Sequence, residues 1–342
     1  MRVKLLVSVL VVMGLVYGLA LGWRHAIASA RTYAEEAAME GEGNETARIS
    51  EGFDLGGATR LTIENAYGSI EVKAGGPQVT VERTVYAGGD TGEARARAAR
   101  FTLAAGPDGG DGYKISVRGQ RERPRVRVDL AVEVPPQLAL SLQVASGEAR
   151  VSGMGSSVTV STGSGGISVE SIAGPVAAKT GSGDILVKAA QSGVTAATGS
   201  GDIELTQVHG PTDAKTGSGS VMVRGARGDQ ISLKTASGSL DLTDIAGQSL
   251  VAESASGSIQ MSVSEPFSGE MRLRTASGSI SLALPAGSDC RLDASTASGS
   301  VSSSLPLAEI TSRGRSLSGR LGAGKGHIEA KTASGSVELK QA

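Results

Sequence analysis

From Ala145 onward, apolar residues return at fixed distances from a recurring Ser-Gly pair. Apolar residues stand two and four places after the glycine, as Ile185 and Val187 do after Gly183, and the residue between them is mostly polar across the repeats. A threonine or serine stands three places before it, and an alanine or leucine five places before most of them. Alternation with a period of two is typical of a strand with one buried face. The pattern predicts strand, tight corner, strand and a looser return in every unit.

The spacing of these corners predicts the fold class. The corner glycines are Gly147, Gly165, Gly183, Gly201, Gly219, Gly238, Gly257, Gly278, Gly299 and Gly335, which are 18, 18, 18, 18, 19, 19, 21, 21 and 36 residues apart. A βαβ unit takes roughly 30 residues, and a propeller blade takes about 40. A flexible Gly/Ser linker would not keep apolar columns in register. We therefore predict an all-β chain, with a single parallel, right-handed β-solenoid over residues 137–342.

Stacked coils place like residues above like. The interior is expected to hold ladders of Ile and Val and of Thr and Ser, which agrees with an aromatic content of only 3%. The serine before each glycine is expected to turn inward and to bond the corner backbone. The interval of 36 residues before Gly335, being twice 18, is expected to span two coils.

Residues 53–136 are predicted to form an N-terminal cap, because an end coil would otherwise expose a sheet edge. Apolar alternation at Leu61–Ile63 and at 69–72 flanks Tyr67-Gly68 as an early copy of the unit. Residues 91–101, rich in Ala, Arg and Glu, predict one short helix with Asp90 or Thr91 as its N-cap.

The first thirty residues are predicted to form a membrane anchor or a cleaved signal segment. The run 5–23 is uncharged and follows Arg2 and Lys4, and its 19 residues are enough to cross a bilayer as a helix. Residues 31–52 are acidic and predict a flexible stalk. With either interpretation of residues 1–30, the rest of the chain is expected to be exported to the cell envelope. If residues 1–30 are an anchor, the membrane is a partner through residues 5–23.

Charge and cysteine content limit the function. The chain has 33 Lys and Arg against 34 Asp and Glu, which argues against a general nucleic-acid binder. The single cysteine, Cys290, excludes an internal disulfide framework. Three histidines far apart in sequence do not have the spacing of a zinc site. We assign no catalytic residue and no cofactor.

Two sets of charged residues recur at one repeat position. Asp184 and Asp202 both follow a corner glycine, and stacked carboxylates can hold Ca²⁺, although solvated surface charge is the simpler interpretation. Four places before the glycine, a broken basic stripe is formed by Lys179, Lys215, Lys234, Arg274 and Lys331. The stripe is a candidate binding face, and it would also block unwanted strand pairing. The segment 319–326 comes within one residue of a phosphate-binding loop, but Gly326 replaces the Ser or Thr of that motif.

The residues resemble a bacterial family. The run Val128-Asp-Leu-Ala-Val-Glu-Val-Pro135, the segment 138–142, the stacked Thr-Gly-Ser-Gly-Asp-Ile units and the start at 65–70 are similar to the DUF4097 proteins, which are provisionally labelled adhesins. The end, from Leu317-Ser-Gly-Arg-Leu-Gly322 into residues 331–337, is similar as well. This resemblance implies an exported or membrane-anchored β-solenoid and supplies no catalytic residues.

These observations favour a non-enzymatic, adhesin-like surface module that binds an envelope protein or a glycan. Two alternatives stay open: a scaffold or regulatory component of an envelope-stress system, and a polysaccharide-active enzyme built on a β-helix.

Overall fold

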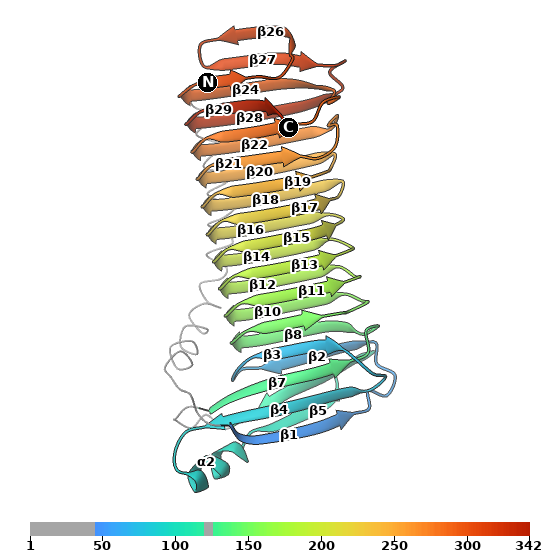
Figure 1. Cartoon of the computed structure of the whole chain (residues 1–342). Coiled ribbons are helices and arrows are strands. Elements are labelled where there is room, and N and C mark those ends of the chain that lie inside the picture. The colour runs from blue at the N-terminus through green and yellow to red at the C-terminus, as the bar shows by residue number, and fades with distance from the viewer. Residues whose placement is uncertain (1–44, 120–125) are drawn as a thin grey trace. The chain divides into compact units, whose positions relative to one another are not determined.

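The computed structural model of the chain describes residues 45–119 and 126–342 (Figure 1). These residues form two compact units, one ending at Gln191 and the other beginning at Ser192. The predicted membrane segment, residues 1–30 with its uncharged run 5–23, lies outside the described residues. Within the described ranges, no helix is long and apolar enough to cross a membrane.

The unit that ends at Gln191 contains thirteen strands and one helix among its described residues. Its elements are β1 (Glu45–Phe53), β2 (Arg60–Asn65), β3 (Ile70–Ala74), β4 (Val79–Ala87), α2 (Thr91–Ala98), β5 (Thr102–Pro107), β6 (Gly112–Arg118), β7 (Val126–Val134), β8 (Ala139–Ser146), β9 (Ala149–Ser152), β10 (Val158–Ser164), β11 (Ile167–Ile172), β12 (Val176–Ser182) and β13 (Ile185–Ala190). In one sheet the order of these strands is β1-β4-β7-β3-β9-β11-β13, and in the other it is β12-β10-β8-β2-β6-β5.

Parallel stacking in this unit begins earlier than residue 137. Strands β2 and β3 flank the Tyr67-Gly68 corner and pair in parallel with β8 and β9, so they already form a coil. Capping elements surround this coil: β4 pairs antiparallel with β7, and β5 with β6. The predicted short helix is confirmed as α2, whose N-cap Asp90 accepts the backbone N–H groups of Gly92 and Glu93 at 3.0 and 2.9 Å.

The predicted flexible stalk is wrong for residues 45–52. These residues belong to β1, which pairs antiparallel with β4 over its whole length. The charged residues of this strand, among them Arg48 and Glu51, are typical of a protected edge strand. Glu51 lies 3.6 Å from Arg83, a residue of β4 that is only 4% exposed and that also donates to the Phe101 carbonyl at 2.6 Å.

The unit that begins at Ser192 contains β14 (Val194–Ser200), β15 (Ile203–His209), β16 (Thr212–Ser218), β17 (Val221–Arg227), β18 (Gln230–Ser237), β19 (Leu240–Ile245), β20 (Ser249–Ser256), β21 (Ile259–Val263), β22 (Glu270–Ser277), β23 (Ile280–Leu284), β24 (Cys290–Ser298), β25 (Val301–Ser303), β26 (Ala308–Arg313), β27 (Ser316–Leu321), β28 (Gly326–Ser334) and β29 (Val337–Gln341). One sheet has the order β14-β16-β18-β20-β22-β28-β24-β27-β26, and the other has β15-β17-β19-β21-β23-β29-β25. Each coil contributes one strand to each sheet, as the predicted strand-corner-strand unit requires (Figure 1). The right-handed sense of the coil stays a prediction.

The interior of each coil is formed by the predicted apolar columns. In the coil of β18 and β19, Leu233 and Leu242 are fully buried and Leu240 is 1% exposed. Parallel pairing aligns Leu233 with Ala214 below and Ala252 above, so like residues stack in register. Full burial of one such leucine contributes about 1.5–3 kcal/mol.

At most corners the predicted inward role of the serine is wrong, and the threonine or serine three places before the glycine takes it; Ser146, at the first corner, is buried. Thr235 is fully buried, and its Oγ1 donates to the Gly219 carbonyl of the neighbouring coil at 2.9 Å. The same bond recurs at 2.8–3.0 Å from Thr180, Thr216, Ser254, Thr275, Thr296 and Thr332. Ser237 is exposed instead, because the corner that follows turns it away from the interior.

Two separate constraints require glycine at the corner. Gly238 has φ of +148°, in the range that residues with a side chain rarely adopt. A Cβ built there would also overlap the Gly219 carbonyl oxygen of the coil below. Close backbone stacking at the corner therefore explains why this position never varies among the ten corners.

A second conformational column lies six places after the corner glycine. Ser171, Ala189, Gln207 and Asp244 all have φ between +53° and +58°, and Gly225 occupies the equivalent place in its own coil with φ of +70°. The left-handed conformation is about 1–2 kcal/mol unfavourable for residues other than glycine. Nothing in the apolar periodicity predicts this feature.

The last coil in the sequence is not the last in space. Strand β28 lies between β22 and β24, and β29 lies between β23 and β25. The expectation of two coils in the 36-residue interval is therefore wrong. Besides β28, that interval holds the short strand β25 and the antiparallel hairpin of β26 and β27, which pairs with β24 and ends the sheet.

Candidate binding surface

The predicted basic stripe lies on the outward side of one strand in each coil. In the unit that begins at Ser192, strand pairing aligns its members in the order Lys215, Lys234, Glu253, Arg274, Lys331 and Ser295. Lys179 lies on β12 of the other unit, where it is aligned with Ser161. The structure therefore brings the stripe into register, with Glu253 and Ser295 as its interruptions.

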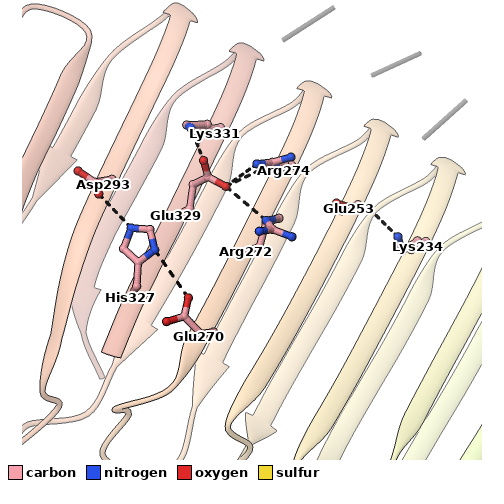
Figure 2. A network of polar contacts seen from close by, with 9 residues as sticks. All are labelled: Lys234, Glu253, Glu270, Arg272, Arg274, Asp293, His327, Glu329 and Lys331. Atoms are coloured by element: carbon pink, nitrogen blue, oxygen red, sulfur yellow. Dashed lines mark hydrogen bonds and ion pairs between the residues drawn. The ribbon is translucent and has the colours of Figure 1, made fainter. Parts of the chain in front are cut away.

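The stripe is not a row of unpaired cations. Lys215 Nζ donates to Asp213 Oδ2 at 2.5 Å within its own strand. Lys234 Nζ lies 2.8 Å from Glu253 Oε2 on the next strand (Figure 2). The Glu253 side chain is only 9% exposed, so the acid that interrupts the stripe is also the partner of the lysine beside it.

Around Glu329 the charges form a cluster. Its Oε2 accepts from Arg274 Nη2 at 2.6 Å and from Arg274 Nε at 3.2 Å, and it lies 3.4 Å from Arg272 Nε. Its Oε1 accepts from Lys331. Figure 2 shows this carboxylate between two strands, β28 that carries it and β22 that carries both arginines.

Two opposing effects set the acidity of Glu329. Burial raises the pKa of this carboxyl, whose side chain is 14% exposed, but the hydrogen bonds and positive charges of Lys331 and Arg274 outweigh burial. The pKa is lowered to about 2. Glu329 therefore stays ionised, and its ion pairs stay formed, throughout the range in which proteins normally function.

His327 bridges three strands on the same face. Its Nε2 lies 3.0 Å from Asp293 Oδ2 on β24, and its Nδ1 lies 3.7 Å from Glu270 Oε2 on β22 (Figure 2). Asp293 also accepts from Ser318 Oγ at 2.6 Å. Burial raises the pKa of Asp293, but the bonds from Ser318 and His327 outweigh it and lower the pKa. The serine donates to the carboxylate and not to the imidazole, so these three residues lack the arrangement of an activated nucleophile.

The two aspartates proposed for Ca²⁺ lie in different units, Asp184 in the one that ends at Gln191 and Asp202 in the other. Asp202 Oδ1 accepts the backbone N–H of Ser220 at 2.7 Å, so this carboxylate stabilises the corner of the next coil. No group of three or more His, Cys, Asp and Glu side chains that could hold a metal ion occurs within residues 45–119 and 126–342. The Ca²⁺ site stays a prediction.

The glycine-rich segment 319–326 is occupied by the chain's own carboxylate. Asp289 Oδ1 accepts the backbone N–H groups of Gly324 and Lys325 at 2.6 and 3.2 Å, and Lys325 Nζ lies 3.6 Å from Asp289 Oδ2. Burial raises the pKa of Asp289, but these backbone bonds outweigh it and lower the pKa. The segment leads into strand β28 rather than into a helix, so it is not a phosphate-binding loop.

The surface of the described residues offers few apolar anchors. Ile49 on β1 and Ile310 on β26 are the exposed large hydrophobic residues of this part of the chain. Protein–protein interfaces are usually centred on buried aromatic, methionine or arginine anchors. The outward faces of the coils instead present columns of polar and charged side chains.

Sequence analysis found the stripe but missed the residues beside it. Arg272, Glu329 and Asp293 share the column two places before the stripe, and Glu270, His327 and Arg291 share the column two places earlier. Aligning these columns could have found the residues individually. Their contacts could not be found, because they depend on β28 lying out of its sequence order.

Comparison with known proteins gives a family and several structures. A family model described as Toastrack DUF4097 matches residues 58–340. No curated protein matches the sequence.

Three solved structures illustrate the similarity. A Clostridium sporogenes protein provisionally named for cell adhesion is 9% identical, with 86% of this chain and 99% of that chain covered and a TM-score of 0.22. A Parabacteroides distasonis protein provisionally named for lipid binding is 12% identical, with 88% and 98% covered and a TM-score of 0.36. A Bacteroides fragilis protein provisionally named an adhesin is 10% identical, with 86% and 97% covered and a TM-score of 0.33.

Proposed function

Because this chain belongs to the Toastrack DUF4097 family, we propose that it is an exported, non-enzymatic binding module of the cell envelope. The sheet face that carries the stripe holds an anionic polymer, and residues 5–23 anchor the module in the membrane. The name of the structural relative from Bacteroides fragilis is compatible with a surface role of this kind.

One observation carries the choice of face. On β16, β18, β22 and β28, the cations Lys215, Lys234, Arg274 and Lys331 stand on one outward side of one sheet, in the register of paired strands. Glu253 on β20 interrupts them between Lys234 and Arg274. Paired strands lie about 4.8 Å apart. A polymer with a charge on each repeating unit can follow such a row and make many weak contacts at once.

The choice of an anionic polymer rests on what the face offers. Arg272 and Arg291 are exposed on the columns beside the stripe and extend its positive charge. Glu329 and Glu253 are largely buried beneath their cationic partners, with side chains 14% and 9% exposed, whereas Asp293 and Glu270 are 44% and 73% exposed. Protein interfaces usually combine arginine with aromatic or other large apolar anchors, and among the described residues the exposed large hydrophobic side chains are Ile49 and Ile310, on two edge strands.

Binding of the full chain in detergent to a polyuronate tests the proposal. We expect wild type to bind the polyuronate and to lose most of that binding when the polymer's carboxyl groups are reduced to alcohols. The double variant Arg272→Gln and Arg291→Gln should bind at least several-fold more weakly. The matched control, Arg224→Gln with Lys340→Gln, removes two exposed cations from the other sheet and should bind as wild type does. Equal loss in both double variants would show that this face is not the site.

A further inference from the structure

The coil formed by β28 and β29, residues 326–341, is called here the C-terminal coil. It fills a slot between two coils that follow each other directly in sequence. Its Thr332 is aligned with Thr275 of β22 on one side and with Thr296 of β24 on the other. In the second sheet, Val337 is aligned with Ile280 and with Val301. The C-terminal coil is therefore paired in parallel on both of its edges.

If the coils form in chain order, this order of strands leaves a slot open during folding. The chain passes from β23 to β24 through residues 285–289 only, so the two neighbours of the C-terminal coil both precede it directly in sequence. When the C-terminal coil enters, β22 and β24 cannot be paired with each other. Folding in chain order therefore passes through a state with an open slot, whose strand edges accept another strand.

The apolar residues do not determine which coil enters the slot. The inward residues of β28 are Ile328, Ala330 and Thr332, and those of β24 are Leu292, Ala294 and Thr296, which fill equivalent positions. Repeats of such similar shape are prone to incorrect pairing between copies. The outward charged side chains differ between the C-terminal coil and the coil of β24, whereas the interior side chains do not.

The charges that distinguish the C-terminal coil are those of Figure 2. Glu329 of the C-terminal coil binds Arg272 and Arg274 on one wall of the slot, at 3.4 and 2.6 Å. His327 lies 3.0 Å from Asp293 on the other wall. These contacts on both walls lie at the place where coil order departs from sequence order.

We propose that this charge cluster directs the C-terminal coil into the slot, and that the slot accepts the C-terminal coil of a second copy of the chain. Every contact that the coil makes with the two walls is available in the second copy, so the exchange conserves the pairing at low cost. The product is a dimer in which two surface modules are linked through reciprocal coils, which doubles the binding faces presented together.

The connection to the C-terminal coil has the features of a hinge. Residues 322–325 link β27 to β28, which lie on opposite sides of β24, so this short segment crosses the end of that strand. Gly322 and Gly324 have φ of +59° and +78° there, and Asp289 holds the segment through Gly324 and Lys325. A short hinge under such constraint favours exchange, because the exchanged form lets the segment extend.

A charge-swap experiment on the full chain in detergent tests the proposal. One copy carries Glu329→Arg, and the other carries Arg272→Glu with Arg274→Glu. Within either copy alone, the coil and its own slot then carry like charges, whereas each coil finds opposite charge in the slot of the other copy. Refolded together, the two copies should form a one-to-one dimer of twice 34.3 kDa by native mass spectrometry. The fraction of protein in the dimer should be at least ten-fold higher in the mixture than in either copy refolded alone.

Two further variants keep the result interpretable. A single chain that combines all three substitutions restores opposite charges internally, and it should recover the thermal stability lost by the separate copies. Glu338→Arg, an exposed substitution in the same coil but on the other sheet, should form no dimer with the Arg272→Glu, Arg274→Glu copy.

Two results would overturn the proposal. If the triple-variant chain recovers stability but the mixed copies stay monomeric, the slot accepts only its own coil. If the triple-variant chain does not recover stability, the charges do not direct the coil. Both results are independent of polymer binding, so they leave the proposed function untouched.

Discussion

Replacing Glu329 by glutamine should weaken the contact between β28 and β22 in a pH-dependent way. The carboxylate is 14% exposed and is bound by Arg272, Arg274 and Lys331. Glutamine keeps the size of the side chain and removes the charge, so three cations lose their common partner. The loss is specific to the coil that lies out of sequence order.

The magnitude follows from the acidity of Glu329. Its pKa of about 2, against an ordinary value of 4.5, sets an upper limit of about 3.4 kcal/mol on the stabilisation by the ionised carboxyl. Arg272, Arg274 and Lys331 have side chains 53%, 32% and 34% exposed, so water screens part of this. We therefore expect a loss of about 1–2 kcal/mol at pH 7.

The pH dependence has a definite sign. Because the folded-state pKa is depressed, the stabilisation is complete above pH 4.5 and is lost as the pH falls toward 2. Urea unfolding at pH 7, 5, 4 and 3 gives the free energy of unfolding at each pH. The difference in this free energy between wild type and Glu329→Gln should become smaller from pH 5 to pH 3. Glu338→Gln, an exposed change in the same coil, should match wild type throughout. A gap of constant size from pH 7 to 3 would refute the reasoning.

Three further predictions concern the coils themselves. Thr235→Val should lower stability by about 1–2 kcal/mol in urea unfolding, because a fully buried donor to the Gly219 carbonyl is lost, whereas exposed Ser237→Ala should change nothing. Ala189→Gly should raise the free energy of unfolding in urea by about 0.5–1 kcal/mol, because φ is +54° there; a lowered free energy of unfolding would contradict this. Cys290 is buried, which raises its pKa to about 11, so a thiol reagent at pH 8 should label it only after unfolding.

The coil could be predicted from the sequence because strand alternation and parallel register reinforce each other. A shift of one residue would turn Leu233 and Leu242 outward, so the apolar columns determine both the strands and their pairing. The helix at Thr91–Ala98 was predictable for a local reason, since Asp90 supplies the cap.

The corner was predicted less well because alternation stops there. Ser237 stands one place before a glycine with φ of +148°, and the direction of its side chain depends on that turn rather than on the period of two. Thr235, still within the regular strand, points inward as the alternation requires.

The position of the C-terminal coil could not be predicted from spacing. Because the interiors of the coils are so similar, the period of the sequence shows only the order of the coils along the chain. It does not show their order in space. The members of the stripe were therefore predicted from their shared repeat position. The contact of Glu329 with Arg274 joins residues 55 positions apart and depends on β28 lying between β22 and β24.

The most direct test of the account is the salt dependence of polyuronate binding to the full chain, measured by calorimetry. Binding through the cations of the stripe face should weaken steadily from low to physiological ionic strength, because salt screens exposed charges. Arg272→Gln with Arg291→Gln should bind more weakly and respond less to salt than wild type. Binding that is unaffected by salt, or equal for the polyuronate and its carboxyl-reduced form, would contradict the account.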